Sequence, residues 1–196
     1  MPKLWDETIE AHRQAVRDKT LDTTAALVHE FGLSAVTMSQ IAKATGIGRA
    51  TLYKYFPDVE SIMVAWHQRQ LATHLARLAE IAEHTSSRPP RDRLAAVLTA
   101  YAAMSHGHEG SELATLLHRG EHVAAAREQL RGFLRDLLHQ AAQAGVVRHD
   151  VPLDELVGFC LHALTAAGGL PGPDGVDRLV RVTLDGLSDH QGSGSP

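Results

Sequence analysis

The chain has 196 residues, a formal net charge of −4 and a hydrophobic content of 44%. This length and apolar content suffice for one or two globular domains, and no run of about 18 apolar residues indicates a transmembrane helix. A single cysteine, Cys160, excludes an internal disulfide framework. Because the N-terminus is also too polar for a signal peptide, we expect a cytoplasmic protein with reduced thiols.

Only 5% of the residues are aromatic, and Ala and Leu are abundant, which favours helices over strands. Apolar periodicity and turn residues predict an all-α chain of nine helices. Residues 1–5 are expected to form a loose arm, Asp150 is a possible helix cap, and 168–175 is predicted to be a turn. The first helix is expected to end at Phe31, two short helices lie within 37–56, and the other six span 58–84, 91–105, 111–118, 121–144, 152–167 and 176–188.

The segment 37–56, TMSQIAKATGIGRATLYKYF, has the pattern of two short helices joined by a tight turn. Thr37 and Gln40 have the spacing of a capping box. Gly46 stands where the chain must reverse, and glycine accepts a left-handed conformation at little cost. Leu52 and Phe56 return the second helix to the core at a spacing of four. Its other side chains then face outward, where cations, hydroxyls and phenols suit phosphates and base edges.

The charge of this region supports contact with nucleic acid. Between residues 31 and 56 the chain carries the cations Lys43, Arg49 and Lys54 and no Asp or Glu, although the whole chain is acidic. A DNA backbone attracts such a local patch. The succession of Thr, Ile-Ala, Gly-Ile and Thr-Leu-Tyr-Lys-Tyr-Phe resembles the DNA-binding signature of TetR-type transcriptional regulators. The resemblance extends from about His12 into the segment 57–70.

This resemblance implies a three-helix, helix-turn-helix DNA-binding domain in residues 1–56 and a six-helix ligand-binding and dimerisation domain in 57–190. It implies a homodimeric repressor that an unknown small molecule releases from double-stranded operator DNA. The sequence QGSGSP at 191–196 is expected to be a disordered tail. No enzymatic activity, cofactor or membrane partner is expected. Two positions depart from the family pattern, because Val59 replaces a phosphate-contacting Lys and Gly48 replaces a helix-capping Ser. The expected DNA-binding residues are Thr37, Ser39, Gly48, Arg49, Ala50, Thr51, Tyr53, Lys54 and Tyr55.

Bulky and polar side chains in a chain otherwise rich in Ala and Leu predict an apolar effector pocket between helices four, five, seven and eight. Each of these side chains could equally be ordinary core. The expected pocket residues are Met63, Trp66, His67, Tyr101, Met104, Leu117, His118, Phe133, Phe159 and His162. Helices eight and nine are expected to pair with their copies in a dimer, although both stripes could instead fold onto one monomer core. The expected apolar centre of that interface is Leu156, Phe159, Leu164, Val180, Leu184 and Leu187.

The thirteen histidines suggest an alternative, a metal-responsive regulator, in which His106, His108 and Glu109 join His118 or His122. The pattern H-x-x-E-H at 118–122 matches one class of zinc proteases, but Gly120 falls at a predicted helix break and no third ligand is indicated. Cys160 and His162 lie two apart on a helix, so they point to different faces, and Cys160 is expected in the core. A di-iron bundle needs Glu-x-x-His pairs, which the sequence lacks.

Overall fold

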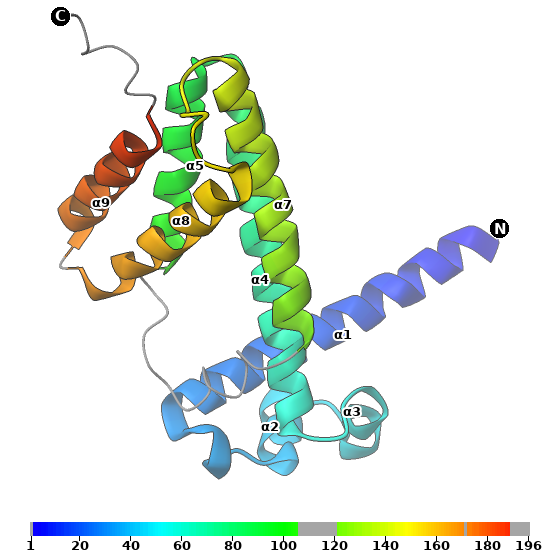
Figure 1. The fold of residues 1–196 in the computed structure, drawn as a ribbon. Helices are drawn as coiled ribbons and strands as arrows, with labels where there is room; N and C mark the ends of the chain where they lie inside the picture. Colours follow the sequence, from blue (N-terminus) through cyan, green and yellow to red (C-terminus); the bar gives the residue numbers. More distant parts are fainter. Residues whose placement is uncertain (1, 106–120, 171, 189–196) are drawn as a thin grey trace, which may run out of the picture. The chain divides into compact units, whose positions relative to one another are not determined.

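The computed structural model describes residues 2–105, 121–170 and 172–188 (Figure 1), and the side chains from residue 9 onward except Glu121. Eight α-helices and two 3₁₀ turns account for most of these ranges, which contain no β-strand. Within them, no helix is both long enough and apolar enough to cross a membrane. The predicted helix 111–118 and the tail 191–196 lie outside the described residues. The helices are α1 (Pro2–Phe31), α2 (Met38–Thr45), α3 (Arg49–Tyr55), α4 (Val59–His84), α5 (Pro90–Ser105), α7 (Glu121–Gln143), α8 (Leu153–Thr165) and α9 (Gly172–Leu187), and the turns are η1 (Leu33–Ala35) and η2 (Ala166–Gly169).

The described residues divide into two compact units. The first contains residues 2–71 and 121–123, and the second contains 72–105 and 124–188 apart from residue 171. The helix α4 therefore belongs to the first unit up to Leu71 and to the second from Ala72. The domain boundary predicted at residue 56 divides the chain by function, whereas these two units are divided by their packing. The predicted boundary therefore stays a prediction.

In the first unit, α1, α2, α3 and the beginning of α4 enclose one apolar core. The predicted inward residues Ile41, Leu52 and Phe56 are all buried there, which agrees with the helical spacing that predicted them. The helix α4 contributes side chains over two turns, so it is part of this packing rather than a linker. The buried members are Leu21, Val28, Val36, Met38, Ile41, Ala42, Leu52, Phe56, Ile62, Met63 and Ala65.

The N-terminal helix differs from the prediction at both ends of its apolar stripe. It begins at Pro2, so residues 2–5 are helical and the loose arm was a wrong prediction. Proline is tolerated in the first turn of a helix, where the missing N–H would have no partner. Ile9 and Phe31 are apolar residues of this helix that sequence periodicity places on an inward stripe, yet both are exposed in the structure. Gly32 ends the helix as predicted, with a positive φ of 83°.

In the second unit, α5 packs against both α8 and α9, and α8 packs against α9 (Figure 1). Leu98, Leu138 and Leu164 are fully buried in its core. Cys160 is buried among them, as predicted, and this burial raises the pKa of its thiol to about 12. An isolated antiparallel bridge between Val147 and Ser188 ties the α7–α8 connection to the end of α9. The Arg148 N–H strengthens this tie by donating to the Leu187 carbonyl at 2.8 Å.

Two expectations about helix starts in this unit were wrong. The helix α9 begins at Gly172, four residues before the predicted start, because the Pro and Gly taken as a turn occupy its first turn, where Pro173 removes no hydrogen bond. Asp150 does not cap α8, whose N-cap is Pro152 without a side-chain hydrogen bond. The carboxylate of Asp150 instead pairs with Arg148 at 2.6 Å, which lowers the pKa of that carboxyl.

Candidate nucleic-acid interface

The turn between α2 and α3 is fixed at both ends of α2. The Gln40 N–H donates to Thr37 Oγ1 at 3.3 Å and the Thr37 N–H donates to Gln40 Oε1 at 2.7 Å, so the predicted capping box is confirmed. Gly46 ends the helix in the left-handed conformation, with φ 74°, and its N–H donates to the Ala42 carbonyl. A residue with a Cβ would be strained at this φ. The chain therefore reverses at a position that its own sequence specifies.

Thr45 also supports the turn, although sequence reasoning did not single it out. Its side chain is buried, and Oγ1 donates to the Ile41 carbonyl at 2.8 Å. The same oxygen accepts the N–H of Ile47 at 3.3 Å, across the reversal. A threonine near a helix end and two residues before an apolar residue is the signal that could have identified it.

The helix α3 buries Leu52 and leaves its remaining surface open. All nine predicted DNA-binding residues are exposed: Thr37, Ser39, Gly48, Arg49, Ala50, Thr51, Tyr53, Lys54 and Tyr55. Tyr53 and Tyr55, at 48% and 38% exposure, belong to the small group of exposed large apolar side chains. Lys43, Arg49 and Lys54 are also exposed, so the local positive charge faces solvent. Such a surface can bind phosphates and reach base edges. DNA contact by each residue stays a prediction.

Both departures from the family pattern have a visible consequence. Gly48 is the N-cap of α3 and makes no side-chain capping bond. Val59, in place of a cation, is half-buried and packs against the apolar core of the first unit. In this chain that position therefore supports the fold and carries no charge for a phosphate.

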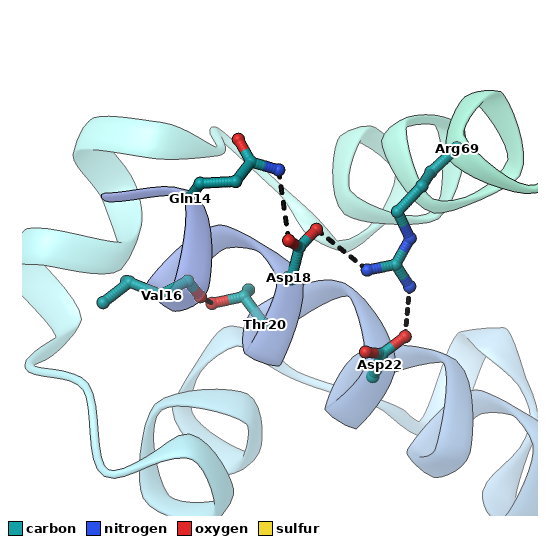
Figure 2. A network of polar contacts seen from close by, with 6 residues as sticks. All are labelled: Gln14, Val16, Asp18, Thr20, Asp22 and Arg69. Atoms are coloured by element: carbon teal, nitrogen blue, oxygen red, sulfur yellow. Dashed lines mark hydrogen bonds and ion pairs between the residues drawn. The ribbon is translucent and has the colours of Figure 1, made fainter. Parts of the chain in front are cut away.

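The helix α1 contacts both α3 and α4 through polar side chains. The guanidinium carbon of Arg17 lies 5.1 Å from the ring centroid of Phe56, at the end of α3, within cation–π range. Asp18, the next residue, and Asp22, one turn further along α1, both accept hydrogen bonds from Arg69 of α4 (Figure 2). Gln14 donates to the other oxygen of Asp18 at 3.2 Å. These contacts hold α3 and α4 to the same part of α1.

The predicted effector-pocket residues do not all come together. Met63 and Trp66 pack in the core of the first unit, whereas Tyr101, Met104 and Phe133 are half-buried against the core of the second. Burial raises the pKa of Tyr101, while contacts with Ser105 and Arg127 oppose that effect. Phe159 and His162 are exposed on α8. Leu117 and His118 lie outside the described residues.

The predicted dimer residues likewise divide by burial. Leu156, Leu164, Val180 and Leu187 are buried within one protomer, because α5 lies against the faces of α8 and α9 that carry them. Leu184 is half-buried, and Phe159 is 42% exposed. Val182, which the prediction omitted, is 67% exposed.

One pair of histidines is brought together by tertiary structure alone. The buried side chain of His67 lies with Nδ1 3.1 Å from Nε2 of His122, and the two rings are nearly perpendicular. Across the described ranges, no group of three His, Cys, Asp or Glu side chains is arranged to hold a metal ion. His106, His108, Glu109 and His118 lie outside those ranges. The described residues therefore give the metal-responsive alternative no support.

Replacing Thr37 by Ala removes the acceptor for the Gln40 N–H and should lower the free energy of unfolding by about 1 kcal/mol. Thr37→Ser keeps the hydroxyl and should retain most of that stability. Urea denaturation of the three proteins, followed by circular dichroism, measures the difference. Equal midpoints for the Ala and Ser variants would show that the capping box contributes nothing.

Comparison with known proteins covers both units. The family model "Bacterial regulatory proteins, tetR family" matches residues 21–65, and the model "Transcriptional regulator SbtR-like, C-terminal domain" matches residues 89–189. The repressor KstR2 of Mycobacterium tuberculosis (strain ATCC 25618 / H37Rv) is 28% identical over 152 residues, which cover 73% of this chain and 74% of the repressor. The fatty acid metabolism regulator protein of Bacillus subtilis (strain 168) is 21% identical over 119 residues, or 61% and 60% of the two chains.

Solved structures show the same fold. A TetR/AcrR-family regulator from Thermobifida fusca matches with a TM-score of 0.71 at 21% identity, over 87% of this chain and 97% of the other. FadR from Bacillus subtilis, solved in complex with stearoyl-CoA, matches with a TM-score of 0.61 at 16% identity, over 85% and 95%. With a capped helix-turn-helix, an exposed cationic helix α3 and family models matching both its N-terminal and its C-terminal part, this chain belongs to the TetR family of transcriptional regulators.

Proposed function

We propose that this regulator is a homodimeric repressor that leaves its operator when a small molecule binds. The observation that carries the proposal is the helix α3, which presents Arg49, Thr51, Tyr53 and Lys54 to solvent from a turn capped at Thr37 and Gly46. A dimer would place two such helices in successive major grooves, about 34–36 Å apart. The relation to the repressor KstR2 supports repression.

The effector is proposed to be a largely apolar small molecule. Tyr101, Met104 and Phe133 lie half-buried beside an otherwise aliphatic core, where an apolar ligand could replace side-chain contacts. The structural relative FadR was solved with stearoyl-CoA, a molecule with a long apolar chain. To act, the ligand must prefer one of two orientations of α4, because equal affinity for both would leave the operator affinity unchanged. Native mass spectrometry of the purified protein would show a molecule retained through purification.

The DNA interface predicts different effects for two neighbouring cations. Arg49→Ala, at the start of α3, should relax sequence preference because Arg is expected to read base edges there. Lys54→Ala should weaken binding to all duplexes and reduce the slope of log affinity against log salt by about one. Both effects can be measured by fluorescence anisotropy, with a duplex selected by the wild type from a random library and with a scrambled duplex.

Arg88→Ala is the matched control, because Arg88 is exposed in the connection between α4 and α5 and its loss changes the net charge equally. It should bind both duplexes like the wild type. If Arg49→Ala and Lys54→Ala also bound both duplexes like the wild type, α3 would not be the recognition helix.

A further inference from the structure

The helix α4 is attached to the first unit by two kinds of contact. Its apolar side chains, from Val59 to Trp66, pack into the core that also contains Leu52 and Phe56. Arg69 lies one turn further on, beyond the last of these side chains. It donates from Nη1 to Asp18 at 2.9 Å and from Nη2 to Asp22 (Figure 2). The two carboxylates are four residues apart, so they lie on the same face of α1.

The geometry of this contact constrains motion more than an apolar contact does. Packed aliphatic side chains are non-directional, so one helix can shift along another while most of the buried area is kept. A planar guanidinium that binds two carboxylates with two different nitrogens fixes both the rotation of α4 and its position along α1. Arg69 stands just before Leu71, the residue at which α4 leaves the first unit.

The same part of α1 also supports the recognition helix. Arg17 covers the ring of Phe56 at the end of α3, and Leu21 is buried in the common core. Residues 17–22 of α1 therefore bind the end of α3 with one side chain and α4 with two others. A change in the orientation of α4 at Arg69 would therefore act on the one and a half turns of α1 that also contact the end of α3.

We propose that Arg69, with Asp18 and Asp22, is a positioning residue for DNA binding: it locks α4 to α1 in the orientation in which α3 fits the operator. The inference rests on operator binding by α3, as proposed above. In this role Arg69 would act through α1 and α4 and would not itself touch DNA. Its loss should lower the population of the binding-competent orientation, and the apparent affinity should fall by the same factor.

The test uses the full chain and a duplex selected by the wild type from a random library. Arg69→Gln should bind this duplex about fivefold more weakly or worse, which is the lower end of typical coupling between sites. The salt dependence of binding should stay unchanged, because no phosphate contact is lost. The melting temperature should fall by no more than about 4 °C, since partly exposed ion pairs contribute little to stability: the side chains of Asp22, Asp18 and Arg69 are 65%, 38% and 28% exposed.

Three further variants separate positioning from charge and from stability. Arg69→Lys keeps the charge but cannot bridge both carboxylates, so it should also weaken binding. Arg77→Gln removes an exposed cation from the same helix and should bind like the wild type. The exchange of Asp18→Arg with Arg69→Asp should bind more tightly than Arg69→Asp alone, because the new Arg can pair with the carboxylate at position 69.

Several results would overturn the inference. Wild-type affinity in Arg69→Gln would show that the ion pairs do not position α3, and a reduced salt slope would make Arg69 a phosphate contact instead. Ile62→Val shortens a buried side chain of α4 and serves as a stability control. If it lowered the melting temperature and the operator affinity as much as Arg69→Gln does, Arg69 would be only a stabilising residue. An exchange variant no better than Arg69→Asp would also count against it. If the wild type enriched no duplex, the proposed function would fail first, and the inference with it.

Discussion

Replacing Leu52 by Ala is expected to abolish specific operator binding. Leu52 is 1% exposed and is the residue with which α3 packs into the core of the first unit. Truncation would remove its burial and leave a cavity, which together cost about 2–5 kcal/mol. Because α3 has seven residues and no side-chain N-cap, it has little stability of its own to offset that loss. Calorimetry and binding to the selected duplex measure the two effects.

Leu52→Met is the control, since it keeps the volume and the apolar character and should cost less than about 1.5 kcal/mol. It should retain operator binding. An Ala variant that binds the operator with wild-type affinity would show that α3 does not depend on Leu52 for its position.

Charging the exposed apolar face of α8 and α9 is expected to split the proposed dimer. The ring of Phe159 lies over Gly186, where an added Cβ would be 3.2 Å from the ring. Val182 is one turn before Gly186 on the same side of α9, so Phe159 and Val182 form an apolar surface shared by the two helices. Phe159→Glu with Val182→Glu would bury two carboxylates in any interface formed there. The variant should sediment as a folded monomer, since neither side chain belongs to the buried core.

Operator affinity should fall with the dimer, because two linked recognition helices bind about 10²- to 10⁴-fold more tightly than one. Ala124→Glu with Gln129→Glu adds two acids at exposed positions of α7 and should leave both the dimer and the affinity intact. A wild-type protein that sediments as a monomer at micromolar concentration would contradict the two-groove mechanism. A dimer that persists in the doubly charged variant would place the interface elsewhere.

Charging Leu184 and Leu187, two residues predicted at the centre of the interface, would not test the dimer, because Leu187 is 1% exposed. Charging Leu187 would place a carboxylate in the protomer core and unfold the chain, so the loss of a dimer would carry no information. Phe159 and Val182 avoid this ambiguity. The prediction that α8 and α9 form the dimer interface can therefore be tested through Phe159 and Val182.

The sequence by itself determined the helix-turn-helix, because the forces that shape it are local. The capping box of Thr37 and Gln40, the left-handed Gly46 and the inward spacing of Leu52 and Phe56 all act within a few residues, and each is present in the structure. The exposed set on α3 followed directly from that spacing. Local signals misled where Pro and Gly serve as the first turn of a helix, as at Pro2 and Pro173, and at Asp150, which pairs with Arg148 instead of capping α8.

Tertiary structure decided which apolar side chains are buried and which are left exposed. Leu156 and Phe159 both suit the apolar pattern of α8, yet α5 and α9 cover one and leave the other exposed, and periodicity along one helix contains no information about its neighbours. The same reason kept the Arg69–Asp18–Asp22 ion pairs and the His67–His122 contact out of reach of sequence. Each joins residues about 50 positions apart, and such a contact depends on how two helices pack rather than on what either one is made of.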